Sequence, residues 1–112
     1  MPKVEICPAD VVEAEEVVRA ELDSGSAVGL TRDSRGDIFA FPDQCPHRAG
    51  LLSDGWVEDD RVICSVHFAE FDLSTGQAHQ APSDCPNLTF YPVHEVDGMV
   101  YVELPEGEGV DQ

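Results

Sequence analysis

Two short cysteine–histidine pairs constrain the fold of this chain more than any other feature of its sequence. They are Cys45-Pro46-His47 and Cys64-Ser65-Val66-His67, and sixteen residues separate them. Each pair is short enough for one tight loop to aim two side chains at a single point. Residues 56–63 are predicted to form a hairpin that carries the chain away from the first pair and back to the second. The pattern therefore predicts two loops that face each other across one site.

The four side chains of these pairs form a metal-ligand set of two thiolates and two imidazoles. Such a set suits zinc in a tetrahedral site. It also suits a [2Fe–2S] cluster in which two histidines replace two cysteines on one iron. Zinc fingers usually pair like ligands, whereas here each loop supplies one ligand of each kind. This interleaving favours a diamond-shaped cluster with both cysteines on one iron and both histidines on the other, and a zinc-stabilised interaction module is the alternative.

The rest of the chain has the pattern of an all-β protein. Clusters of Asp, Ser and Gly recur at short intervals between runs that are rich in Val, Ile and Phe. These runs predict strands at residues 26–31, 38–41, 61–64 and 99–104, with Asp97-Gly98 as the hairpin turn before the last of them. Several short strands at this spacing are typical of a barrel or a sandwich.

Residues 10–22 are ambiguous. Asp10 could cap a helix, and the apolar residues that follow it fall at roughly helical spacing. The alternative is a turn followed by a strand at residues 16–22. We favour the strand because its predicted neighbours are strands.

The charge of the chain limits its partners. The 112 residues, enough for one domain, include 23 acidic and only 6 basic side chains, a net charge of −17. Nucleic acid and anionic membrane surfaces are therefore disfavoured as partners. A protein with a basic docking patch is favoured, and the alternative is that the acidity only keeps the protein soluble.

The sequence predicts a cytoplasmic protein. The first residues lack a basic stretch followed by an apolar run, and no segment approaches the roughly 20 apolar residues of a membrane span. Structural disulfides are rare in the cytoplasm, so Cys7 and Cys85 are predicted to be small buried hydrophobes. His79 and His94 are predicted to be surface or half-buried strand histidines rather than ligands.

The segments around the two pairs carry a family resemblance. Residues 45–56 (CPHRAGLLSDGW) and 62–76 (VICSVHFAEFDLSTG) resemble the Rieske ferredoxins of bacterial aromatic-ring-hydroxylating dioxygenases, such as the biphenyl, naphthalene and carbazole systems. The resemblance implies a Rieske-like fold of antiparallel sheets in a single domain, residues 1–112. Within it, a cluster-binding part would span about 43–85, and the remainder would form a β base.

The resemblance also implies the roles of the ligands in one bound [2Fe–2S] cluster. Cys45 and Cys64 would hold the inner iron, and His47 and His67 would hold the outer, more exposed iron. Pro82 would lie in a third loop that covers the cluster.

The function implied by the resemblance is single-electron transfer. A flavin-containing, NAD(P)H-dependent ferredoxin reductase would be the donor and a terminal Rieske oxygenase the acceptor, so that the chain is an electron-carrying monomer and not an enzyme. A chain of 112 residues has no room for the oxygenase's own mononuclear iron domain. The small Rieske-like subunit of an assimilatory nitrite reductase is the alternative, which residues 48–50 resemble somewhat more.

The sequence departs from the family pattern just after each histidine ligand. The pattern usually has glycine there, whereas this chain has Arg48 and Phe68. Arg48 is either a contact for a partner carboxylate or a solvated side chain. Phe68 is either an exposed apolar contact beside the outer iron or a core residue.

A second departure predicts a low reduction potential. Rieske centres of respiratory complexes have two hydroxyl-bearing residues and a disulfide near the cluster, and this chain has Ala69, Phe71, Gly50 and Val66 at those positions. Hydrogen bonds to the sulfurs stabilise the reduced state, so their absence lowers the potential. We expect a value near the low end of the roughly −150 to +300 mV Rieske range.

Overall fold

The described residues form three small antiparallel sheets. The structure is a computed structural model that describes residues 3–23, 25–44, 50–65, 68–79 and 87–104. Its regular elements in these ranges are ten strands and two single-turn 3₁₀ helices, which confirms the all-β expectation. The 3₁₀ helices are η1 (Ala9–Val11) and η2 (Leu52–Asp54).

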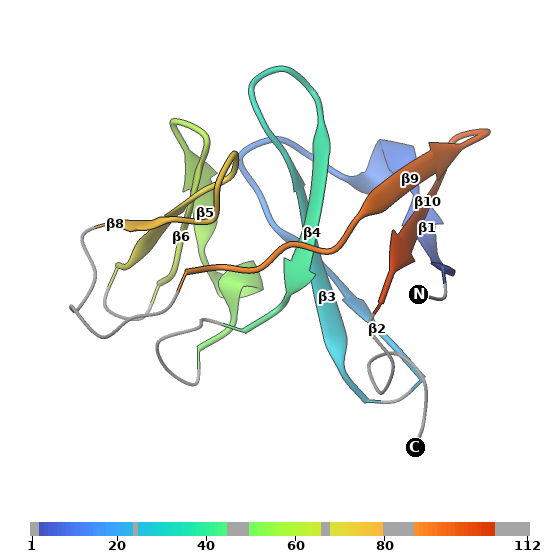
Figure 1. Cartoon of the computed structure of the whole chain (residues 1–112), viewed down its shortest axis with the longest axis horizontal. Coiled ribbons are helices and arrows are strands. Elements are labelled where there is room, and N and C mark those ends of the chain that lie inside the picture. Colours follow the sequence, from blue (N-terminus) through green and yellow to red (C-terminus); the bar gives the residue numbers. More distant parts are fainter. Residues whose placement is uncertain (1–2, 24, 45–49, 66–67, 80–86, 105–112) are drawn as a thin grey trace.

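The central sheet separates the other two (Figure 1). The basal sheet contains β1 (Lys3–Pro8), β10 (Met99–Glu103) and β9 (Val93–Val96), in that order. The central sheet contains β2 (Val18–Glu21), β3 (Ala27–Arg32) and β4 (Ile38–Pro42). The distal sheet contains β5 (Trp56–Glu58), β6 (Arg61–Ile63), β7 (Glu70–Asp72) and β8 (Ala78–His79).

The strands predicted at residues 26–31, 38–41, 61–64 and 99–104 are confirmed as β3, β4, β6 and β10, with ends that differ by at most one residue. The ambiguous segment 10–22 contains no helix longer than the single turn η1 and ends in the strand β2. The strand interpretation of that segment is therefore confirmed.

Two hairpin turns have the left-handed backbone that their residues favour. Asp97 and Gly98 join β9 to β10 with φ angles of 51° and 79°. Asp59 and Asp60 join β5 to β6 with φ angles of 53° and 58°. Tight two-residue hairpins of type I′ require positive φ at both central positions, which Asn, Asp and Gly tolerate best. The second of these hairpins is the one expected between the two ligand loops.

The central sheet has a hydrophobic core on each face. Successive side chains of a strand point to opposite faces, so Phe39 and Phe41 of β4 pack toward the distal sheet, whereas Ile38 and Ala40 pack toward the basal sheet. The distal core consists of Val17, Phe41, Leu52, Val57, Val62, Cys64, Ala69, Phe71, Leu73 and Leu88. The basal core consists of Ala9, Val12, Val28, Leu30, Ala40, Val100, Val102 and Leu104.

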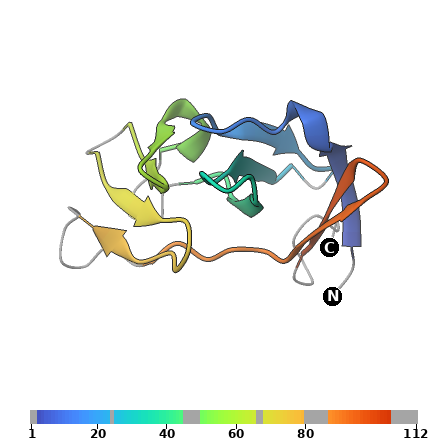
Figure 2. The same ribbon diagram turned by 90° about the horizontal axis from the view of Figure 1, so that it is seen from above.

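The whole distal sheet lies between β4 and β9 in the sequence, and the chain returns from it along one path. An extended segment, residues 87–92, runs beside the central sheet and leads into β9 (Figure 2). On this path the Tyr91 N–H donates to the Ala40 carbonyl at 2.8 Å. A second connection joins two hairpin tips: the Ser34 N–H and hydroxyl both donate to the Asp60 carboxylate at 2.8 Å. These bonds hold the distal sheet against the rest of the protein.

Candidate metal centre

Cys64 lies at the end of β6, where the distal core meets the second ligand loop. Its side chain is fully buried among apolar residues of that core. Its backbone N–H donates to the carbonyl of Ala69 at 2.9 Å, just beyond the last strand pair, Ile63 with Glu70. The loop between β6 and β7 is therefore closed at its base, and Cys64 is held in place by backbone structure on both sides.

The other three predicted ligands lie outside the described residues. Cys45 and His47 belong to residues 45–49, and His67 belongs to residues 66–67. The predicted ligand set of Cys45, His47, Cys64 and His67 therefore stays a prediction, of which the structure places Cys64 alone. Pro82, Arg48 and Val66 also lie outside the described residues.

The end of the first loop packs against the start of the second. Gly55, which follows η2, approaches the backbone of β6 so closely that a Cβ atom there would lie 1.9 Å from the Ile63 carbonyl oxygen. The same atom would lie 3.3 Å from the backbone nitrogen of Ser65. Only glycine fits this contact. The two ligand segments are thus neighbours in space where the structure describes them, as the two-loop interpretation requires.

A buried carboxylate closes the first loop at its base. Asp43, two residues before Cys45, accepts hydrogen bonds from the Ser53 N–H at 2.7 Å and from the Ser53 hydroxyl at 2.6 Å. The guanidinium of Arg19 on β2 also donates to it at 2.7 Å. The Asp43 side chain is fully buried, so these donors replace the water that its charge would otherwise need.

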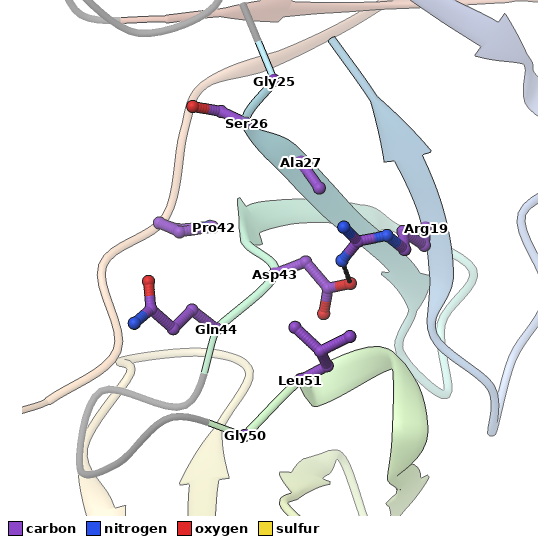
Figure 3. A pocket seen from close by; sticks show the side chains of 9 residues that line it. All are labelled: Arg19, Gly25, Ser26, Ala27, Pro42, Asp43, Gln44, Gly50 and Leu51. Carbon is purple, nitrogen blue, oxygen red and sulfur yellow. Dashed lines mark hydrogen bonds and ion pairs between the residues drawn. The ribbon is translucent and has the colours of Figure 1, made fainter.

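Figure 3 shows how Arg19 reaches Asp43 across one wall of a pocket, which Ser26, Gln44 and Leu51 also line. The hydrogen bond that Arg19 donates to Asp43 raises the pKa of the guanidinium, although desolvation opposes the shift. Arg19 therefore stays charged and keeps its contact with the carboxylate at the base of the first loop.

Sequence reasoning missed this arrangement. Arg19 and Ser53 lie 24 and 10 residues from Asp43, and such separations match no local motif. An Asp two residues before a predicted ligand was the one signal that could have drawn attention to the position.

The remaining predicted non-ligands have other roles. His79 on β8 and His94 on β9 are half-buried strand histidines, as predicted, and each ring pairs with a carboxylate, those of Asp72 and Glu103. Cys7 on β1 is half-buried rather than fully buried, and burial raises the pKa of its thiol. Cys85 lies outside the described residues.

The donor set fits an iron–sulfur cluster. Two thiolates cancel the +2 charge of an oxidised Fe₂S₂ core, and neutral imidazoles add none, so the group can sit beside an apolar core at low cost. The neighbours of Cys64 in the distal core are all apolar. Across the described ranges, no group of three or more His, Cys, Asp or Glu side chains is placed to hold a metal elsewhere.

No helix in those ranges has the length and apolar character needed to cross a membrane.

Comparisons with known proteins agree with this chemistry. Residues 3–95 match the family model of the Rieske [2Fe-2S] domain. The chain is 36% identical over 110 residues to the 3-phenylpropionate/cinnamic acid dioxygenase ferredoxin subunit of Escherichia coli (strain K12), covering 96% of this chain and 99% of that protein.

Two solved structures share the fold. The ferredoxin of Sphingomonas yanoikuyae B1 aligns with a TM-score of 0.82 and 27% identity, covering 93% of this chain and all of that one. The second structure is the complex of reduced oxygenase and oxidized ferredoxin in carbazole 1,9a-dioxygenase. A chain of that complex aligns with a TM-score of 0.76 and 26% identity. That match covers 89% of this chain and 91% of the other.

Proposed function

This chain belongs to the Rieske [2Fe–2S] domain family, and from that membership we propose that it is the ferredoxin of an aromatic-ring dioxygenase system. It takes single electrons from an NAD(P)H-dependent flavin reductase and delivers them to a terminal oxygenase. It is an electron carrier and not itself an enzyme.

The observation that carries this proposal is the end-to-end match to a dioxygenase ferredoxin subunit. The alignment covers 96% of this chain and 99% of the relative, so the similarity spans almost the full length of both sequences. The Sphingomonas ferredoxin matches over its full length as well. The same relationship favours a dioxygenase ferredoxin over the nitrite reductase subunit, the alternative left open by residues 48–50.

The proposed ligands are Cys45 and Cys64 for the inner iron and His47 and His67 for the outer iron. A [2Fe–2S] cluster bound in this way accepts and releases one electron at a time. Cys64 presents its sulfur from the apolar distal core, which keeps water away from that side of the site. Asp43 and Ser53 hold the first loop at its base, and the Cys64–Ala69 backbone bond holds the second.

The domain and the partners are part of the same proposal. Residues 1–112 act as one domain, with the cluster-binding part at about 43–85 carried on the β base. The protein acts as a monomer in the cytoplasm. Its net charge of −17 supports docking on partner surfaces that carry a basic patch.

Metal analysis of matched cysteine variants tests the proposal. Protein purified without oxygen should contain about two irons and two acid-labile sulfides per chain, and its reduced form should give a rhombic electron paramagnetic resonance signal. Cys64→Ala should lose the iron, whereas Cys7→Ala, on a strand of the basal sheet, should keep it. Stoichiometric zinc without iron in the wild-type protein would favour the zinc-stabilised module instead.

A further inference from the structure

An ion pair between Asp43 and Arg19 lies beside the candidate centre. The Asp43 side chain is fully buried, and the Arg19 guanidinium donates to its carboxylate at 2.7 Å (Figure 3). Asp43 stands two residues before the proposed ligand Cys45, and two residues of chain span at most about 7 Å. A buried negative charge is therefore held close to any cluster that Cys45 binds.

The same carboxylate is also tied to the second ligand segment. Ser53 donates its hydroxyl and its N–H to Asp43, at 2.6 and 2.7 Å. Two residues farther along the chain, Gly55 packs against the backbone on both sides of Cys64. The buried charge thus lies near both segments that supply the proposed cysteine ligands.

Among the described residues, Arg19 is the one cation that balances this charge. The other described arginines, Arg32, Arg35 and Arg61, donate to backbone carbonyls or to other carboxylates. Lys3 lies on β1 of the basal sheet. Without Arg19, the buried carboxylate would keep hydrogen bonds but lose the positive charge that offsets its own.

A fixed charge near a redox centre changes how readily the centre accepts an electron. An unpaired anion opposes the negative charge that reduction adds, whereas an unpaired cation favours it. The two charges of a close ion pair largely cancel at a distance. For an effective dielectric constant of about 20 and a separation of about 10 Å, one unpaired charge alters the equilibrium constant for reduction about tenfold. Balance within the ion pair therefore matters to the reduction potential.

We propose that Arg19 is a positioning residue that sets the reduction potential of this protein, because it neutralises the buried charge of Asp43 at the base of the first ligand loop. The inference rests on the proposed function, since it requires the bound cluster. It predicts opposite effects from the two members of one ion pair. Loss of the Arg19 charge leaves an unpaired anion and lowers the potential, and loss of the Asp43 charge leaves an unpaired cation and raises it.

Protein-film voltammetry on the cluster-loaded protein at one fixed pH tests the inference. Arg19→Gln should lower the equilibrium constant for reduction about tenfold, a shift of about 59 mV for a one-electron couple, and Asp43→Asn should raise it by a similar factor. The double variant should return to near the wild-type potential, and Arg19→Lys, which keeps the charge, should restore most of it. Glu21→Gln is the matched control. It also removes one negative charge beside Arg19, but from a side chain that is 75% exposed, so the potential should stay unchanged.

The signs of the shifts separate charge balance from a purely structural role. If the ion pair only held the first loop in shape, breaking it from either side would shift the potential in the same direction, and the double variant would stay shifted. Shifts of equal sign, or an unchanged potential in Arg19→Gln, would overturn the inference.

Voltammetry reads only the molecules that hold the cluster, so a partial loss of iron leaves the comparison intact. If Arg19→Gln retains no iron, the double variant and Asp43→Asn carry the test, and a double variant whose potential is not the lower of the two would overturn the inference. A wild-type protein that holds zinc and no iron would overturn the proposed function, and the inference with it.

Discussion

The carboxylate of Asp43 and the hydroxyl of Ser53 lie 2.6 Å apart, and this hydrogen bond ties the entry of the first ligand segment to its exit. The backbone N–H of Ser53 donates to the same carboxylate. Because Asp43 is buried, its charge depends on Ser53 and Arg19 rather than on water. The first loop is therefore anchored by side chains, whereas the second is anchored by the backbone of a hairpin.

Asp43→Asn should destabilise the protein and loosen the first loop. The variant amide presents hydrogen-bond donors to Ser53 and Arg19 and leaves the Arg19 charge without its buried partner, at a cost of about 2–3 kcal/mol. Urea denaturation measures the stability of the variant. The iron content per chain after dialysis shows whether the first loop still retains the metal. Glu21→Gln is the control, because the Glu21 side chain is 75% exposed and contacts Arg19 at 3.6 Å. It should cost less than about 0.5 kcal/mol. Equal effects of the two variants would contradict the anchoring role.

Gly55→Ala should disturb the contact between the two ligand segments. Its Cβ would meet the backbone of Ile63, which cannot rotate away, so the end of β6 must shift at a cost of about 2–3 kcal/mol. Gly36→Ala, whose Cβ meets nothing within 4 Å at a φ of 90°, should cost only the backbone strain, about 1 kcal/mol. The denaturation midpoint and the iron content are measured for both glycine variants and compared. A Gly55→Ala protein as stable as Gly36→Ala would argue against the close approach.

Added hydroxyls should raise the reduction potential. Ala69 and Phe71 are fully buried and stand where related centres of higher potential have hydroxyl donors to sulfur. If a new hydrogen bond stabilises the reduced state by about 1 kcal/mol, Ala69→Ser should raise the potential by roughly 40 mV, and adding Phe71→Tyr should raise it further. Protein-film voltammetry measures the change. Ala78→Ser, on β8, is the control and should leave the potential unchanged. A wild-type potential above about +100 mV, in the upper part of the Rieske range, would contradict the assignment.

Electron transfer to the oxygenase should depend on salt. With a net charge of −17, the protein should be steered toward a basic partner surface. The rate should fall as ionic strength rises from about 0.02 to 0.5 M, because the Debye length shrinks from roughly 20 to 4 Å. Oxidation by a neutral small molecule should show no such fall. A rate with the oxygenase that is flat in salt would mean that the acidity serves solubility alone.

Asp33 should contribute to stability above its pKa and not below it. Burial opposes its ionisation, but N–H groups of Asp37 and Arg35 and the Arg35 guanidinium outweigh burial, so that its pKa lies below the usual value. The folded state thus binds this proton less tightly than the unfolded state. Its stabilisation is present above about pH 4 and is lost as the pH falls through the lowered folded pKa.

Asp33→Asn should therefore cost about 1 kcal/mol at pH 7, with a cost that shrinks below about pH 4. Urea midpoints across this range measure the effect. Asp37→Asn is the control, because that side chain is 65% exposed. It should change the stability little at either pH 7 or low pH. A cost for Asp33→Asn that is independent of pH would contradict the role of its charge.

The strands and tight turns were predictable from sequence because their signals are local. A run of apolar residues after a turn cluster predicted β4, and Asp97-Gly98 predicted the last hairpin. A metal-ligand set could also be proposed from sequence, since its predicted members come in two short pairs; of these the structure describes Cys64, and the set stays a prediction. The Asp43–Ser53–Arg19 contacts were not predictable, because they join residues from three separate elements. The exposure of Phe68 was not predictable either, because it depends on a left-handed backbone angle that phenylalanine rarely adopts.

The hydrogen bond between Tyr91 and Ala40 bears on how the protein can change during evolution. The distal sheet lies between β4 and β9 in the sequence, and Tyr91, just before β9, pairs with Ala40 of β4, so the two ends of the intervening stretch are neighbours in space. A segment whose ends are already neighbours can be lengthened, shortened or replaced at little cost in loop-closure entropy. A single genetic event within one stretch of coding sequence can therefore replace the distal sheet while every strand pair of the basal sheet survives.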